Sequence, residues 1–220
     1  MKRKIIETAD GSHTIAVPEL NEHYHSVHGA INEAKHVYLK HGLNGVENNP
    51  VTVLEIGFGT GLNALLTYVE AEKLKRKVYY QSVEAYPVDL ETISHLNYVD
   101  KIEEEGAAEK FNQLHLSNWE EEVILSDNFT FKKQKRFFNE INESNKFDVI
   151  YFDAFGPEKQ PELWTEEIFT IMYNSLKEEG ILVTYSAKGA IKRAMKAAGF
   201  KIEALPGPPG KREMTRAIKE

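Results

Sequence analysis

The sequence has no cysteine, which excludes disulfide bonds and zinc sites built on thiolates. It has no apolar run near the roughly 20 residues that a membrane-spanning helix requires. Its first residues, MKRKIIETADG, are charged and lack the apolar segment of a signal peptide. These absences lead us to expect a cytoplasmic protein without a membrane contact.

Excess positive charge is also missing, because 27 basic residues face 34 acidic ones and the net charge is −7. This balance argues mildly against nucleic-acid binding. The stretch 186–220 differs, with nine Lys/Arg against three acids and a local charge of +6. A second basic run, FKKQKRFF, occupies 131–138. Each run is either a solvated face or a phosphate-contacting surface, and the sequence leaves both open.

The composition is that of a globular protein, with 220 residues, 41% hydrophobic and 28% charged. This length suits one α/β domain with a small appendage. We expect an N-terminal hairpin and helical lid over 1–48 and a main domain over 49–220, together forming one structural unit. No internal repeat or low-complexity linker is visible.

Periodicity predicts the elements in order. Residues 5–20 read as a β-hairpin around the turn dipeptide Asp10-Gly11, and 22–41 read as helical with a second break near Gly29. From Val51 onward, apolar strand patterns alternate with amphipathic helices. The predicted strands are 51–57, 77–87, 129–134, 146–155, 180–189, 200–207 and 212–219; the predicted helices are 61–74, 87–126 with breaks, 161–180 and 190–200. Such alternation predicts a mostly parallel sheet, and the short last connection predicts an antiparallel final pair.

A glycine-rich loop, LEIGFGTGLNALL, lies between the first strand of this series and its helix. Gly57, Gly59 and Gly61 permit close approach of the backbone to a ligand. Such a loop alone fits NAD, FAD or S-adenosylmethionine. Glu55 suits the cationic end of a zwitterionic ligand, and Glu84, at the end of the next strand, can accept hydrogen bonds from ribose hydroxyls. The alternative for Glu84 is an ordinary surface acid.

The glycines and the two acids together resemble the class I S-adenosylmethionine-dependent methyltransferases. The resemblance implies a Rossmann-like, mostly parallel seven-stranded sheet with an antiparallel last strand, and S-adenosyl-L-methionine as cofactor. The expected cofactor-binding residues are Glu55, Gly57, Phe58, Gly59, Thr60, Gly61, Asn63, Glu84, Ala85 and Asp153.

The segment FDVIYFDAFGP places Asp153 and Phe155 directly after a strand that we expect beside the glycine-loop strand. A carboxylate there can orient an attacking amine and take up its proton, and an aromatic face attracts a cationic centre. We therefore predict Asp153 and Phe155 as catalytic. The alternative is that Asp153 caps the next helix. The aromatic residue follows the acid by two positions, whereas amino-group methyltransferases of this fold usually have three.

Five segments carry a closer resemblance: DGSHT, YHSVHGAINEAKHVY, IYFDAFGPEKQPELW, TYSAKG and KREM. Together with the glycine loop they resemble the MnmC/MnmD family of tRNA methyltransferases over nearly the whole chain. The resemblance implies methylation of 5-aminomethyl-2-thiouridine at the tRNA wobble position. It implies the tRNA anticodon stem-loop, and the enzymes that supply the aminomethyl intermediate, as partners. At this length we expect no fused oxidase domain.

The same segments suggest substrate-binding residues, namely Tyr24, Ser26, Glu33, His36, Lys188, Lys211 and Arg212. Two alternatives stay open: His36 as an ordinary helix residue, and the lysines and Arg212 as a solvated face. We expect no metal, although His23, His25 and His28 could bind zinc on composition alone.

Other functions remain open. The acidic net charge favours a methyltransferase that acts on a small-molecule amine, and the basic tail disfavours it. A catalytically inactive scaffold is disfavoured by the presence of Asp153 and the glycine loop. An NAD-dependent oxidoreductase is weakest, because the loop does not keep the G-x-G-x-x-G spacing.

Overall fold

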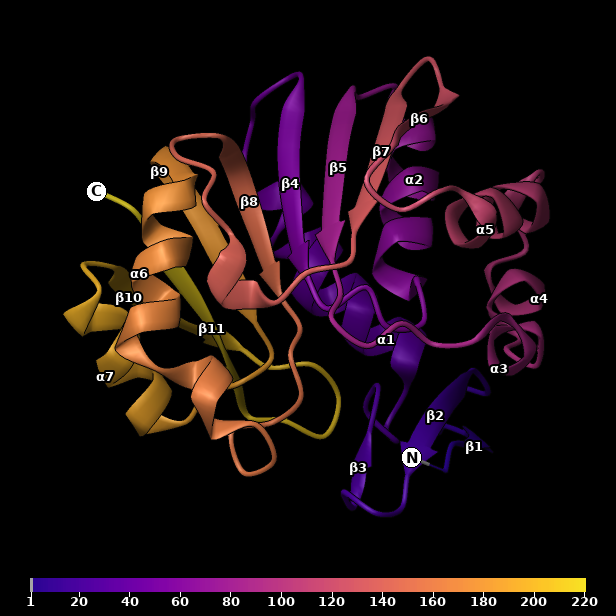
Figure 1. Cartoon of the computed structure of the whole chain (residues 1–220), viewed down its shortest axis with the longest axis horizontal. Helices are drawn as coiled ribbons and strands as arrows, with labels where there is room; N and C mark the ends of the chain where they lie inside the picture. Colours follow the sequence, from indigo (N-terminus) through magenta and orange to yellow (C-terminus); the bar gives the residue numbers. More distant parts are fainter. Residues whose placement is uncertain (1) are drawn as a thin grey trace.

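A mixed sheet of eight strands organises the computed structural model, which describes residues 2–220 (Figure 1). The strand order is β10-β11-β9-β8-β4-β5-β7-β6. The strands are β4 (Val51–Ile56), β5 (Val78–Val83), β6 (Glu122–Ser126), β7 (Phe129–Gln134), β8 (Phe147–Phe152), β9 (Leu176–Thr184), β10 (Lys201–Pro206) and β11 (Glu213–Ile218). The five central strands are parallel, and β11 runs antiparallel to both of its neighbours. The expected fold class is confirmed.

Helices cover both faces of this sheet, which is why β8 is buried along its whole length. One set comprises α1 (Ala30–Ala34), a π-helix (Lys35–Lys40), α2 (Leu62–Leu74), α3 (Leu90–Ser94), α4 (Tyr98–Ile102) and α5 (Ala107–Leu116). The other face carries α6 (Glu166–Ser175) and α7 (Gly189–Ala197). Short 3-10 helices span Leu43–Gly45, Phe138–Glu140 and Pro161–Trp164. No helix within residues 2–220 is both long and apolar enough to cross a membrane.

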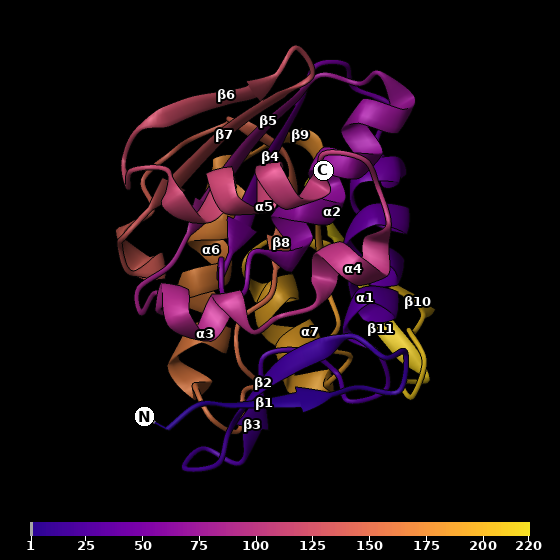
Figure 2. The same cartoon turned by 90° about the vertical axis from the view of Figure 1, so that its right-hand side faces the viewer.

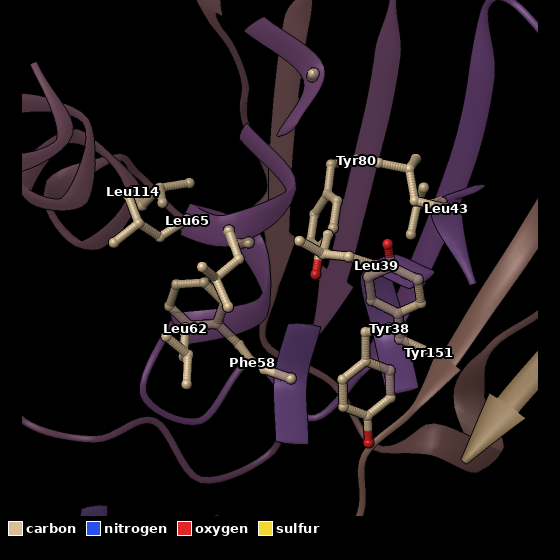
Figure 3. Close-up of a cluster of buried hydrophobic side chains, with 14 of the residues drawn as sticks. Tyr38, Leu39, Leu43, Phe58, Leu62, Leu65, Tyr80, Leu114 and Tyr151 are labelled. Atoms are coloured by element: carbon tan, nitrogen blue, oxygen red, sulfur yellow. The ribbon is translucent and has the colours of Figure 1, made fainter. Parts of the chain in front are cut away.

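The hydrophobic core has two parts, one on each face of the sheet. In the first, Tyr38 from the π-helix and Leu65 from α2 pack with Tyr80 and Tyr151 from the sheet (Figure 3). The π-helix is therefore an integral part of the layer that covers the sheet. The second part joins β8 to α6 and α7.

A separate three-stranded sheet is formed by β1 (Lys4–Glu7), β2 (His13–Val17) and β3 (Glu22–His23), which confirms the predicted hairpin. Asp10 organises its turn by accepting hydrogen bonds from the Ser12 amide (3.1 Å) and the Thr8 hydroxyl (2.8 Å). Its second oxygen accepts from the Asn32 amide (2.9 Å) and so ties the turn to α1. Figure 2 shows this small sheet at the end of the large sheet where β4, β5 and β8 terminate.

Four local predictions were wrong. The helix expected from Glu22 begins only at Ala30, because 22–23 pair with β2 and Gly29 takes a positive φ of 134°. The helical stretch expected to reach 126 ends at Leu116, and the β-branched residues of β6 pair with β7. The sheet therefore has eight strands instead of seven. The helix expected to reach Gly180 ends at Ser175, because Leu176 already pairs with Phe147.

Candidate active site

A cavity of about 580 Å³ opens at the carboxyl ends of β4, β5 and β8. Three regions line it: the glycine loop, the residues after β5, β7 and β8, and the N-terminal segment. The lining residues used below are Arg3, Tyr24, His25, Gly57, Phe58, Gly59, Thr60, Asn63, Glu84, Ala85, Tyr86, Phe137, Phe138, Asn139, Asp153, Phe155 and Leu163. Its size lies within the range of small-molecule sites.

The glycine loop turns tightly because its backbone adopts conformations that disfavour side chains. Gly57 has a φ of +94°, and a Cβ added there would lie 2.9 Å from the carbonyl oxygen of Asp153. Gly59 has a φ of +50°, and an added Cβ would lie 3.2 Å from the ring of Tyr24. The loop therefore brings backbone, β8 and the N-terminal segment within contact distance at the cavity floor.

Glu84 follows β5 and is held by two backbone amides. One oxygen accepts from Gly59 at 3.0 Å and the other from Tyr86 at 2.8 Å. Because each carboxylate oxygen can accept more than one hydrogen bond, the side chain retains capacity for a pair of ligand hydroxyls. The position at the cavity wall suits the ribose role predicted for Glu84.

Asp153 follows β8, and its backbone amide donates to the Ile56 carbonyl at 3.0 Å. One carboxylate oxygen accepts from the side-chain amide of Asn63 at 2.8 Å. The pKa of Asp153 is raised to about 6, mainly by burial and in part by the charge of Glu33, although Tyr38, Asn63 and Lys211 act to lower it. A carboxylate with such a pKa can accept a hydrogen bond or a proton near neutral pH.

Phe155 also lines the cavity, and its ring meets Tyr24 edge to face at a centroid distance of 4.9 Å. The Phe155 carbonyl accepts a hydrogen bond from the indole of Trp164 at 2.8 Å. The contact between Tyr24 and Phe155 joins the N-terminal segment to the loop after β8 above the cavity.

Some predicted cofactor residues lie behind the cavity wall. Phe58, Thr60, Asn63 and Ala85 line the cavity, but Glu55 does not. Glu55 is fully buried, and one of its oxygens accepts from the Ser82 hydroxyl at 2.6 Å. Burial raises the pKa of Glu55 to about 8. A carboxyl group with this pKa is mostly protonated at neutral pH, and Glu55 is therefore a neutral hydrogen-bonding group of the protein interior.

The predicted substrate residues divide into two groups. Glu33 accepts from the Ser26 amide at 3.1 Å and forms an ion pair with Lys211 at 2.6 Å, so both belong to a cluster next to Asp153. The Lys211 ammonium also lies 4.0 Å from the ring centroid of Tyr185. This cluster joins α1 to the loop between β10 and β11.

Three other predicted substrate residues, His36, Lys188 and Arg212, do not line the cavity. His36 hydrogen-bonds the Pro206 carbonyl at 2.8 Å and packs against the ring of His41. Lys188 is exposed and pairs with Glu158. Arg212 is exposed and forms no ion pair within the part of the chain that the structure describes.

Two cations of the basic run 131–138 form neither a solvated face nor a phosphate-contacting surface, because both are engaged within the protein. Lys133 is buried and donates to the carbonyls of Leu114 (2.9 Å) and His115 (2.6 Å). Arg136 forms a bidentate pair with Glu143, at 2.6 and 2.8 Å. These cations stabilise the fold next to the cavity.

The N-terminal histidines do not converge. The imidazole of His25 contacts the Thr60 hydroxyl at 2.7 Å, and burial lowers the pKa of His25 to about 4. His28 packs instead against Gly210. Among residues 2–220, no group of three His, Cys, Asp or Glu side chains is arranged to hold a metal.

Sequence reasoning missed several lining residues: Arg3, His25 as a wall residue, Tyr86, Phe137, Phe138, Asn139 and Leu163. Phe137 and Phe138 follow the carboxyl end of β7, so the rule that ligands bind at strand ends could have found them. No local signal marks Arg3, which reaches the cavity through its contacts with Asp89 (3.1 Å) and the Tyr24 hydroxyl (3.4 Å).

The residues present fit S-adenosyl-L-methionine. Glu84 offers acceptors for ribose hydroxyls, and the glycine loop allows a close backbone approach. Apolar walls of Phe137, Phe138 and Leu163 suit a flat base, consistent with the absence of an acid after β7. Asp153, which lines the cavity, would supply the negative charge that favours binding of a positively charged sulfur.

The parallel sheet, the glycine loop and the acid after β5 define the Rossmann-like methyltransferase class. A sequence model of one family, described as S-adenosyl-L-methionine-dependent methyltransferase, matches residues 106–220, more than half of the chain. The chain belongs to this family, and it is an enzyme of the methyltransferase class that uses S-adenosyl-L-methionine.

Individual relatives agree with this assignment. The chain is 29% identical over 208 residues to the tRNA 5-methylaminomethyl-2-thiouridine biosynthesis bifunctional protein MnmC of Leptospira borgpetersenii, covering 87% of this chain and 31% of that one. It is 29% identical over 233 residues to the protein of the same name in Legionella pneumophila, covering 92% and 34%. The chain thus spans about a third of the length of these curated relatives.

A solved structure, MNMC2 from Aquifex aeolicus, superimposes with a TM-score of 0.80 at 25% identity, over 100% of this chain and 70% of that one. The spermidine synthase of Thermotoga maritima has a TM-score of 0.51 at 16% identity, covering 100% of this chain and 72% of that one, and shares the fold alone.

Proposed function

We propose that this enzyme methylates the amino group of 5-aminomethyl-2-thiouridine at the wobble position of tRNA, giving 5-methylaminomethyl-2-thiouridine. The relatives' names give tRNA and the product nucleoside, 5-methylaminomethyl-2-thiouridine, and the motifs from DGSHT to KREM span the same region. The proposed partners are the tRNA anticodon stem-loop and the enzymes that make the aminomethyl intermediate. The proposed place of action is the cytoplasm.

The observation that carries the proposal is Asp153, a carboxylate at the cavity floor that Asn63 holds in place. When bound, S-adenosylmethionine supplies a methyl group on a positively charged sulfur. Asp153 accepts a hydrogen bond from an N–H of the amine, which directs the nitrogen lone pair toward the cavity. The developing positive charge on the nitrogen is stabilised by the same carboxylate, which then takes up the released proton.

The surface formed by residues 186–220 bears on tRNA binding. Six of its nine cations form ion pairs with nearby acids, namely Lys188, Lys192, Lys201, Lys211, Arg216 and Lys219. Arg193, Lys196 and Arg212 are exposed and form none among residues 2–220. We assign phosphate contacts to these three and to Lys188.

The neutralisation of six cations, together with the net charge of −7, favours a second candidate, a small-molecule amine as acceptor. The two candidates differ in their response to tRNA. Unmodified tRNA should inhibit the enzyme by competition if tRNA is the substrate, and it should have no effect on transfer to a small amine.

The direct test is nucleoside mass spectrometry of tRNA that carries 5-aminomethyl-2-thiouridine, after incubation with the protein and S-adenosylmethionine. We expect conversion to the nucleoside heavier by one methyl group, and no conversion by Asp153→Ala, which should still bind the cofactor. Cofactor binding without conversion by the natural protein would exclude this substrate and direct the search to small amines or to a scaffold role.

A further inference from the structure

Tyr38 is a buried tyrosine whose role in the fold leaves its hydroxyl unexplained. The side chain is 2% exposed, and the hydroxyl has no hydrogen-bond partner within residues 2–220. A buried hydroxyl without a hydrogen-bond partner destabilises the folded state, because it loses its hydrogen bonds to water without replacement. Native proteins seldom retain such a group without a reason.

The surroundings of Tyr38 are rigid. Its ring packs on Tyr151 of β8 at a centroid distance of 5.1 Å (Figure 3). It belongs to the π-helix Lys35–Lys40, a form of helix that is rare and frequent at functional sites. The ring is thus fixed next to the strand that ends in Asp153.

The Asp153 carboxylate is the charge that acts most strongly on this hydroxyl. Burial raises the pKa of Tyr38, and the negative charge of Asp153 is the next largest cause. In return, Tyr38 lowers the pKa of Asp153. Tyr151, on which the Tyr38 ring packs, lies two positions before Asp153, so both side chains point to the same face of the sheet. The phenol therefore lies beside the carboxylate, which Asn63 of α2 holds at 2.8 Å.

We propose that Tyr38 is a positioning residue for Asp153: its hydroxyl donates to the carboxylate once that carboxylate is ionised. This inference rests on the proposed function, because it concerns the carboxylate that receives the amine. With Asn63 and Tyr38 both donating, Asp153 keeps one orientation and remains ionised. Its remaining lone pairs then point to the amine.

Other groups also face Asp153. Glu33 from α1 raises its pKa, whereas Lys211 from the loop between β10 and β11 lowers it. Four more titratable groups interact with its charge: Tyr185 after β9, Glu55 on β4, Tyr80 on β5 and Tyr98 on α4. Removing the Tyr38 hydroxyl leaves all of these in place, so the acid limb of the pH–rate profile should move to higher pH.

The test compares Tyr38→Phe with Tyr151→Phe in the full chain. Tyr151 is an equally buried phenol in the same stack, and its hydroxyl lies 3.4 Å from Thr67. For Tyr38→Phe we expect kcat on the aminomethyl-bearing tRNA to fall about 10- to 100-fold, the loss of one hydrogen bond to a charged group. The cofactor Kd should stay within about twofold, because Tyr38 does not line the cavity. Tyr151→Phe should keep the natural pH profile.

A second readout needs no acceptor. In protein labelled with carbon-13 at the aspartate carboxyl groups, an NMR titration gives the pKa of Asp153 directly. Tyr38→Phe should raise it and Tyr151→Phe should not. An unchanged Asp153 pKa in Tyr38→Phe, or an equal change in both variants, would overturn the inference. If the natural protein fails to methylate the tRNA but Tyr38→Phe still raises that pKa, only the proposed function falls.

Discussion

Asp153→Asn should stabilise the folded protein while it abolishes methyl transfer. The side chain is surrounded by buried groups, and burial raises the pKa of Asp153 from 3.8 to about 6. Asparagine has nearly the same shape and still offers an oxygen to Asn63. The variant therefore removes a desolvated negative charge without removing the contact that holds the side chain.

The magnitude follows from the difference in pKa between the unfolded and the folded protein. A shift from 3.8 to about 6 corresponds to about 3 kcal/mol at most. Because the folded pKa is raised, the contribution of this group to stability is complete below pH 3.8 and is lost as the pH rises through about 6. The cavity is open to water, so we expect a gain of about 1–3 kcal/mol for the variant at pH 7.5 and less at pH 5.

The assay is urea unfolding of the natural protein and Asp153→Asn at pH 5, 6 and 7.5, without cofactor. Asp127→Asn, at an exposed aspartate in the turn before β7, serves as the control and should change little. The gain should increase with pH and correspond to a rise of about 2–4 °C in Tm per kcal/mol. A variant that is less stable than the natural protein at every pH would refute the reasoning, since the site would then stabilise the ionised carboxylate.

Three other substitutions test the cofactor side. Glu84→Ala should weaken S-adenosylmethionine binding by about 10- to 100-fold through lost charge-assisted hydrogen bonds, as calorimetry can measure; an unchanged Kd would remove Glu84 from the ribose site. Glu55→Gln should keep cofactor affinity, and a large loss of affinity would instead indicate direct contact with the cofactor. The same variant should gain stability relative to the natural protein as the pH rises from 4.5 to about 8, because the natural carboxyl group stabilises the folded state less over this range. Gly57→Ala should destabilise the folded protein by more than Gly106→Ala, for which we expect about 1–2 kcal/mol. Both glycines have a positive φ, but only at Gly57 does a backbone atom lie within 3 Å of the added Cβ, so equal losses of stability in thermal unfolding would contradict the close approach to Asp153.

The sequence predicted those elements of the fold that depend on the local pattern of residues. The unbroken apolar run of β8 identified a strand buried on both faces, and Asp10-Gly11 identified the hairpin turn. In the edge strand β6, Val123 and Leu125 face the core, but the apolar Ile124 between them is 76% exposed. The sequence therefore shows three consecutive apolar residues instead of an alternation, and the strand was missed. This segment is a strand because it pairs with β7, and the local sequence pattern does not show that pairing.

In the site, too, local pattern predicted some residues and missed others. Glu84 and Asp153 were expected to lie together because the carboxyl ends of parallel strands meet at one edge of the sheet, and both line the cavity. Glu55 was predicted to bind the cofactor. It lies on β4, which is covered on both faces, so its side chain points into the protein interior, where it accepts a hydrogen bond from Ser82. Tyr38 ends one of the segments that carry the family resemblance, but the sequence predicted no role for it. The role that we propose depends on Asp153, more than a hundred positions away.

The Glu33–Lys211 ion pair joins residues that are 178 positions apart. Gly57, Glu84 and Asp153, which line the cavity, leave the ribosome before Lys211 does. Because chains are synthesised from the N-terminus, the Glu33–Lys211 pair is among the last contacts near Asp153 that can form. A nascent chain, or one truncated before Lys211, therefore carries these cavity residues without the ion pair that joins α1 to the loop between β10 and β11.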